Sequence, residues 1–166
     1  GGTVTTSGGN IIHSFTSSGT LTFGYQAEYL VIAGGGGAGA GLGSATYASA
    51  AGGAGGYRNS FASETSGRNA STEAVAVFVT GTEYTVTIGA GGPVTNAEGG
   101  AGGVSSIAGT GLTTVTSLGG GTGYAPTVTN KDGGSGAGQG DSVGTGGQRA
   151  GSGTTGQGFG GGGNSG

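Results

Sequence analysis

The sequence lacks cysteine, methionine and tryptophan, and it has only two prolines, four basic and seven acidic residues in 166. Without cysteine, neither disulfides nor thiolate chemistry is available. The charged residues are scattered singly, and Lys131 beside Asp132 is the nearest approach to a charged run. No basic patch could neutralise a phosphate backbone, so nucleic acid is not an expected partner.

Long apolar runs are also missing. A membrane span needs ~20 consecutive apolar residues, and the longest stretches here are about a quarter of that length. We therefore expect no membrane insertion. Because no methionine occurs, Gly1 cannot follow directly from a translated start, and we expect the chain to be a processed or excerpted piece.

What the chain has in quantity is glycine, with 49 residues against 31% hydrophobic and 7% aromatic residues. A conventional core of large side chains cannot account for such a composition. A disordered low-complexity segment is one alternative. Disorder is usually maintained by net charge and sparse β-branched residues, whereas here the net charge is only -3 and Val, Ile and Thr cluster in short runs. Disorder therefore fails as an explanation in the runs and stays open between them.

Short β-rich runs punctuated by glycine and serine predict an all-β domain over residues 1–166. We expect a strand-rich part (1–33), alternating strands and glycine segments (34–131) and a glycine-rich end (132–166). No stretch sustains apolar spacing at 3.6 residues with good helix formers, so no α-helix is expected. The predicted strands are Thr3–Thr6, Asn10–Thr16, Thr20–Phe23, Glu28–Ala33, Ala74–Val79, Thr82–Ile88, Val104–Ile107 and Leu112–Leu118.

Several of these strands run without punctuation into glycine. Glu28–Ala33 continues into residues 34–43, Thr82–Ile88 into residues 89–92, and Leu112–Leu118 into residues 119–121. This recurrence indicates a structural rule in which a strand feeds a glycine segment.

Ordered glycine segments lose much conformational entropy, so packing must offset that loss. An extended left-handed helix with three residues per turn points its N–H and C=O groups outward, where neighbouring helices can bond to them. Side chains block close approach, so interior helices must be nearly pure glycine with an occasional alanine. We therefore predict a bundle of polyglycine II helices. Collagen is excluded because glycine does not recur at every third position, and silk-like stacking of residues 37–41 remains an alternative.

Four blocks carry a family resemblance: Ile12–Phe23, Glu28–Gly39, Gly52–Arg58 and Tyr84–Gly92. Together they resemble the glycine-rich domains of bacteriophage tail-fibre and structural proteins. More distantly, the chain is similar to the glycine-rich extracellular domain of the anaplastic lymphoma kinase receptor. The resemblance implies a jelly-roll-like β-sandwich with inserted polyglycine II helices, and loops that contact the host surface. Members of the family usually close with an apolar strand, whereas this chain ends at residues 163–166, so we expect that strand to be missing or supplied from elsewhere.

No motif for catalysis stands out. Gly151–Gly156 matches the spacing of a dinucleotide-binding loop, but it follows no strand and opens no helix, so chance explains it. His13 is the sole histidine and lies in a predicted strand, no nucleophile elbow occurs, and the acidic residues form no motif. We expect no enzyme activity, no cofactor and no metal site.

Two functions remain open from the sequence. The first is a binding module on an extracellular or virion surface, such as a tail-fibre or adhesin domain that contacts a host receptor or glycan. The second is the repeating subunit of an extracellular filament or capsid decoration, in contact with its own copies or other fibre proteins. Aromatic and arginine side chains dominate binding hot spots, which makes those between the glycine segments candidates for recognition. The alternative is that these side chains only cap the ends of the glycine helices. The candidate binding residues are Tyr47, Tyr57, Arg58, Phe61, Arg68 and Tyr124.

Assembly has its own candidate segment. Thr3, Val4, Thr5 and Thr6 form a predicted strand flanked by glycines. A sheet that lacks one strand exposes unpaired N–H and C=O groups, which another chain can fill. We therefore expect Thr3–Thr6 to be a free strand that can pair with a neighbouring subunit.

Overall fold

The computed structural model describes residues 2–19, 21, 24–39, 49–94, 99–123, 131–140 and 149–163. Within these ranges the chain forms short strands and one 3₁₀ turn, η1 (Gly67–Asn69), and no α-helix. None of the described residues belongs to a helix that could cross a membrane. The strands are β1 (Thr3–Ser7), β2 (Asn10–Ser14), β3 (Gly24–Ala27), β4 (Leu30–Ile32), β5 (Tyr57–Asn59), β6 (Ala76–Val79), β7 (Thr85–Thr87), β8 (Ser105–Ala108) and β9 (Val115–Ser117).

All strand pairs are antiparallel, and each sheet is small. β1 pairs with β2, β3 with β6, and β4 with β5, while β7, β8 and β9 form a three-stranded sheet in that order. The predicted all-β class with short antiparallel strands is confirmed, and the jelly-roll connectivity stays a prediction. β3 and β5 were not predicted, and residues 20, 22 and 23 of the predicted strand Thr20–Phe23 lie outside the described residues.

The strand at the N-terminal end requires a correction. Thr3–Thr6 was expected to be free-standing, but β1 pairs with β2 along its whole length, from Thr3 opposite Ser14 to Ser7 opposite Asn10. Gly8 and Gly9 make this possible because their φ angles of 55° and 79° lie in the left-handed region that a two-residue hairpin turn needs. One edge of β1 is therefore occupied within the chain, and donation to another subunit stays a prediction for its other edge.

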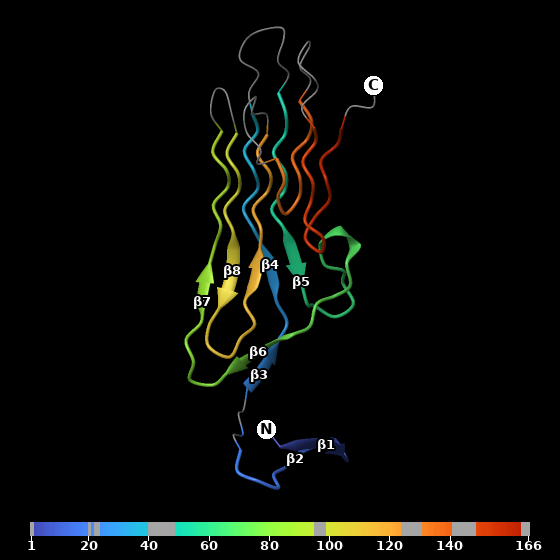
Figure 1. The fold of residues 1–166 in the computed structure, drawn as a ribbon, viewed down its shortest axis with the longest axis vertical. Coiled ribbons are helices and arrows are strands. Elements are labelled where there is room, and N and C mark those ends of the chain that lie inside the picture. Colours follow the sequence, from blue (N-terminus) through green and yellow to red (C-terminus); the bar gives the residue numbers. More distant parts are fainter. Residues whose placement is uncertain are drawn as a thin grey trace.

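Glycine-rich extended segments, here called rods, continue directly from the strands. Three strands precede rods: β4 is followed by rod 33–39, β7 by rod 89–93 and β9 by rod 119–123. Two rods precede strands: rod 50–56 is followed by β5, and rod 99–103 by β8. Figure 1 shows these rods side by side as one bundle above the strands. The predicted rule that a strand feeds a glycine segment is confirmed at all three predicted places.

Backbone hydrogen bonds join the rods with a period of three residues. In rod 33–39, the N–H groups of Ala33, Gly36 and Gly39 donate to rod 50–56, at Gly56, Gly53 and Ala50. The N–H groups one residue later, at Gly34 and Gly37, donate to Gly103 and Gly100 of another rod. Ile32, Gly35 and Ala38 are exposed and face solvent. A helix with three residues per turn gives this division into three directions.

The hydrogen bonds arrange the rods in two layers. Rod 33–39 lies between rods 89–93 and 50–56 in the first layer, and it also bonds to rods 99–103 and 119–123 in the second. The first layer contains rods 89–93, 33–39, 50–56 and 158–162. The second layer contains rods 99–103, 119–123, 133–139 and 150–153. Rod 133–139 bonds to the last rod of each layer. The Gly136 N–H donates to Phe159 of rod 158–162, and the Gly151 N–H of rod 150–153 donates to Ala137.

Close approach of the backbones explains why inner positions are glycine. A Cβ placed on Gly36 would lie 2.0 Å from the carbonyl oxygen of Gly121, whereas one on outward-facing Gly35 would meet nothing nearer than 3.8 Å. Large apolar side chains contribute little to the interior. Among the described residues, the buried hydrophobic ones are Val31, Ala33, Ala50, Ala76, Val115 and Ala137. The core is therefore built mostly from backbone.

Candidate functional site

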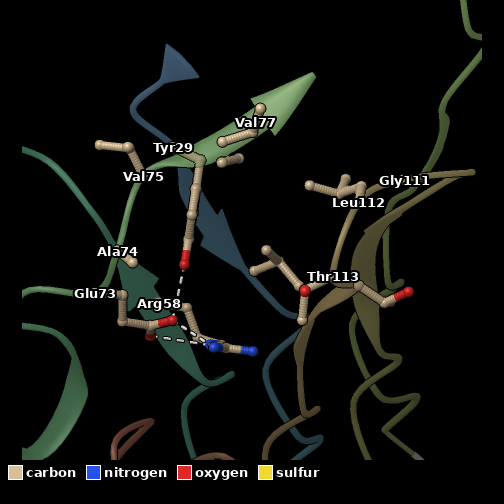
Figure 2. Close-up of a pocket in the computed structure, with 12 residues that line it drawn as sticks. Tyr29, Arg58, Glu73, Ala74, Val75, Val77, Gly111, Leu112 and Thr113 are labelled. Atoms are coloured by element: carbon tan, nitrogen blue, oxygen red, sulfur yellow. Dashed lines mark hydrogen bonds and ion pairs between the residues drawn. The ribbon is translucent and has the colours of Figure 1, made fainter. Parts of the chain in front are cut away.

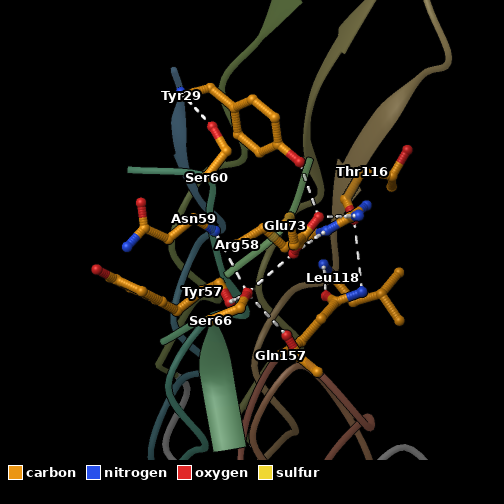
Figure 3. A network of polar contacts seen from close by, with 11 residues as sticks. Tyr29, Tyr57, Arg58, Asn59, Ser60, Ser66, Glu73, Thr116, Leu118 and Gln157 are labelled. Atoms are coloured by element: carbon orange, nitrogen blue, oxygen red, sulfur yellow. Dashed lines mark hydrogen bonds and ion pairs between the residues drawn. The ribbon is translucent and has the colours of Figure 1, made fainter. Parts of the chain in front are cut away.

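A group of polar side chains lies where the strands meet the rod bundle (Figure 3). Arg58 of β5 donates from Nε to Glu73 Oε1 at 2.9 Å and from a terminal nitrogen to Glu73 Oε2. Its other terminal nitrogen donates to the carbonyl of Thr116 in β9 at 3.2 Å. Tyr29, just before β4, donates its hydroxyl to Glu73 Oε2 at 2.8 Å. We call Tyr29, Arg58 and Glu73 the clamp.

The clamp is held in one protonation state. Burial, and after it the hydrogen bond to Glu73, raise the pKa of Tyr29 to about 12. Burial alone would raise the pKa of Glu73, but the hydrogen bonds from Arg58, Tyr29 and Ser66 outweigh it and lower that pKa. The hydrogen bond to Glu73 raises the pKa of Arg58. Near neutral pH the clamp therefore combines a carboxylate, a guanidinium and a protonated phenol.

These contacts tie distant segments together. Arg58 links β5 to β9, Tyr29 anchors the start of β4, and Glu73 precedes β6. Both charged side chains are partly buried, at 26% and 18% exposure, so the pair is better shielded from solvent than an ordinary surface ion pair. The chemistry of the clamp is that of a structural cross-link.

Further hydrogen bonds order the loop that joins β5 to Glu73. Asn59 is 1% exposed, accepts the N–H of Phe61 at 2.8 Å and donates to Glu64 at 3.1 Å. The Ser66 hydroxyl lies 2.9 Å from Glu73 Oε1 and 3.2 Å from the carbonyl of Gly156. Gln157, next to Gly156, accepts the N–H of Leu118 at 2.7 Å, which anchors the segment that Ser66 contacts. Residues 60–72, here called the display loop, are thus fixed to the body of the molecule.

Sequence reasoning missed most of these polar residues. Asn59, Ser66, Glu73 and Gln157 lie in no recognisable motif, and the contacts of Ser66 and Gln157 join segments far apart in the sequence. The one available signal was the scarcity of charge. With four basic and seven acidic residues in the chain, an arginine beside a predicted glycine segment had few possible partners.

An open cleft of about 610 Å³ lies beside the clamp (Figure 2). Tyr29, Arg58 and Glu73 line one part of it. Its other walls are mainly apolar and come from residues 74–77, around the start of β6, and from residues 111–115, which include the first residue of β9. Because the clamp's charged groups already bond to each other, the cleft offers a ligand chiefly apolar surface.

The display loop contains three non-glycine residues with left-handed backbone, Ala62 (φ 44°), Arg68 (φ 60°) and Asn69 (φ 53°). Among the described non-glycine residues no others have a positive φ. For Ala62 and Arg68 such a conformation costs about 1–3 kcal/mol and persists where the surroundings hold it, often at functional sites, whereas asparagine tolerates it. The display loop is therefore the most strained part of the described chain.

The predicted binding residues fall into separate places. Tyr57 and Arg68 line one shallow hollow at the display loop, together with Glu64 and Asn69. Phe61 is 51% exposed and lines a second hollow next to Leu30. Arg58 belongs to the clamp. Tyr47 and Tyr124 lie outside the described residues.

Lys131 is a separate buried charge, only 3% exposed. Its Nζ atom has no hydrogen-bond partner among the residues that the structure describes. Burial lowers the pKa of Lys131, and the nearby charge of Arg149 lowers it further. Because the folded state disfavours the protonated amine, this residue makes the fold more stable as the pH rises towards the ordinary pKa of lysine.

The fold and the site together define a small β-scaffold that carries a bundle of backbone-bonded glycine rods and one well-fixed loop. A family model described as a glycine-rich domain matches residues 13–166, and the chain belongs to this family. Comparisons with curated proteins and with solved structures gave no match.

Proposed function

We propose that this chain is a non-enzymatic binding module on an extracellular or virion surface. The most specific form of the proposal is a bacteriophage tail-fibre or adhesin domain, in which the rod bundle carries loops that contact a host receptor or glycan. The resemblance of the sequence to such domains suggests this setting. The fixed and strained display loop is the observation that supports it best.

The hollow at the display loop has groups suited to polar ligands. Tyr57 offers an aromatic ring, and Arg68 offers a guanidinium that has no ion pair with any described residue. Glu64, Asn69 and neighbouring hydroxyl groups add acceptors and donors. Because the clamp and Asn59 fix the loop in advance, a ligand would lose little free energy in ordering it.

Substitutions in the hollow test this proposal. Tyr57→Val removes the ring but keeps a residue that favours strands, and Arg68→Asn removes the charge but tolerates left-handed backbone. Tyr25→Thr is the control, because Tyr25 is exposed in β3 and lies outside the hollow. The probe is the fluorescently labelled chain, measured by flow cytometry on a panel of whole bacterial cells.

We expect the wild-type chain and the Tyr25→Thr control to label some of the cells alike. Each hollow variant should lose about tenfold or more in binding, because hot-spot side chains contribute about 2 kcal/mol or more. All variants should stay folded at the temperature of the binding measurement, which their unfolding temperatures check. Labelling of no cells, or equal labelling by the hollow variants, would contradict the proposal.

A second candidate function is a repeating subunit of an extracellular filament or capsid decoration, assembled by strand addition. The β1–β2 hairpin favours this candidate, because both of its strands are exposed throughout.

A further inference from the structure

The β1–β2 hairpin stands apart from the rest of the chain (Figure 1). Every residue of both strands is exposed, including Val4, Ile12 and Ile11, the last at 68%. In the register of the hairpin, Val4 and Ile11 lie on one face and Ile12 on the other. A hairpin of two strands is marginally stable in water by itself. Apolar residues on both faces indicate that the hairpin is covered on assembly.

The body of the molecule has an uncovered apolar surface of its own. Rods 33–39 and 89–93 run in the same direction and are joined by the Gly92 N–H bond to Gly35 at 2.8 Å. Where the chain enters these rods, four large side chains are exposed. They are Leu30 (56%), Ile32 (53%), Val86 (61%) and Ile88 (79%), here called the apolar patch.

The two halves of the apolar patch lie level with each other. A Cβ on Gly34 would lie 2.0 Å from the carbonyl oxygen of Ala90, so these two residues are in contact. Ile32 and Ile88 each precede that contact by two residues. Ile32 also faces outward, one turn before Gly35 on the exposed side of its rod. The apolar patch therefore spans two neighbouring segments on one side of the bundle.

The edge of β4 beside the apolar patch is also unpaired. Tyr29 and Ala33 bond to the β5 side, through Ser60 and Gly56. Backbone groups alternate along an antiparallel strand, so those of Leu30 and Ile32 point to the opposite edge. No described residue bonds to that edge. The apolar patch thus combines apolar side chains with free backbone donors and acceptors.

We infer that the β1–β2 hairpin of one chain docks on the apolar patch of a second copy of the same chain. No described residue of the same chain covers either surface, so neither satisfies the other within the described part of one molecule. Neither surface contains Asp, Glu, Lys or Arg, so no repulsion between like charges opposes the contact. The family match begins at residue 13, inside β2, so it does not include β1.

The contact joins two different surfaces, so it is heterologous. In a dimer, one subunit would keep a free hairpin and the other a free patch. The assembly would therefore grow head to tail unless it closed into a ring. The inference specifies the assembly surfaces of the second candidate function, and it does not depend on binding by the display loop.

Complementation between two variants tests the inference. The hairpin variant carries Ile11→Thr and Ile12→Thr, and the patch variant carries Ile32→Thr and Ile88→Thr. Threonine keeps a strand-favouring residue at each position. The control is Val94→Thr, which changes an exposed apolar residue outside both surfaces. Mass is measured by sedimentation velocity over a range of concentrations, and folding by the unfolding temperature.

We expect the wild type and the control to grow in mass with concentration, and each double variant alone to stay monomeric. An equal mixture of the two should form dimers that do not grow, since one intact hairpin meets one intact patch. A wild type that is monomeric throughout overturns the inference, as does assembly of either double variant alone. A mixture that stays monomeric also overturns it. The monomeric variants keep the display loop intact. Cell labelling by these variants therefore tests the display-loop proposal independently of assembly.

Discussion

At the scale of single residues, two adjacent glycines in rod 33–39 have opposite surroundings. Gly36 faces the backbone of rod 119–123, and Gly35 faces solvent. Gly36→Ala should destabilise the protein by about 3 kcal/mol, because the added methyl meets a backbone oxygen that cannot move aside. Gly35→Ala should instead stabilise it by roughly 0.5 kcal/mol through the unfolded state.

Urea denaturation of the two variants checks this pair of expectations. Gly36→Val should be worse than Gly36→Ala, and it should prevent folding. Equal midpoints for Gly35→Ala and Gly36→Ala would show that the two positions are not packed differently.

The clamp predicts a dependence of stability on pH. The pKa of Glu73 is lower in the folded state, so its contribution is present above the unfolded carboxyl pKa and is lost as the pH falls through the folded value. Glu73→Gln should cost about 2 kcal/mol near pH 7, the usual value of a hydrogen bond to a charged group. The difference from the wild type should shrink on acidification.

Unfolding free energies of wild type and Glu73→Gln, measured from about pH 7 to about pH 3, give this difference directly. Arg149→Ala is the matched control, because Arg149 forms an exposed ion pair with Asp132. The control should leave the unfolding midpoint almost unchanged at pH 7. A constant difference between Glu73→Gln and the wild type over the whole range would contradict the role given to Glu73.

At the scale of elements, each rod has an inner and an outer side set by its period of three. One glycine inserted after Gly35 would shift the following residues by one position and turn the methyl group of Ala38 from solvent into the bundle. We expect this insertion to cost more than about 2 kcal/mol. Three inserted glycines restore the period and should cost clearly less. Denaturation midpoints compare the two, and equal losses would count against a helix with three residues per turn.

The sequence was sufficient to locate several junctions between strand and rod. At residues 33/34, 88/89 and 118/119 the composition changes abruptly from β-branched or apolar residues to glycine. Only glycine lets backbones approach closely, so each change marks where a strand ends and a packed rod begins. β3 and β5 could not be predicted, because Gly24–Ala27 and Tyr57–Asn59 are weak strand formers whose conformation depends on their partners β6 and β4.

Partner choice was also beyond the sequence. The rods are chemically alike, so nothing in residues 33–39 or 99–103 indicates which rod packs against which. The strand pairs β4–β5, β7–β8 and β8–β9 each adjoin two rods that also bond to each other. The clamp likewise depends on how the display loop folds, because that loop brings Arg58 and Glu73 together across 15 positions of sequence.

At the scale of the whole molecule, the account rests on two layers of rods held by backbone hydrogen bonds. This architecture needs few large side chains, which agrees with a buried hydrophobic set that, among the described residues, consists entirely of alanine and valine. The clamp that fixes the display loop and the apolar patch both lie where strands meet this bundle. Both proposals depend on the bundle being ordered.

Amide hydrogen exchange in rod 33–39, resolved by NMR, tests this claim most directly. Ala33, Gly34, Gly36, Gly37 and Gly39 donate to neighbouring rods, whereas Gly35 and Ala38 are exposed and donate to no described residue. The account predicts slow exchange at the first five amides and fast exchange at the other two, because protection follows the hydrogen bonds of the folded core. Uniformly fast exchange along residues 33–39 would contradict it.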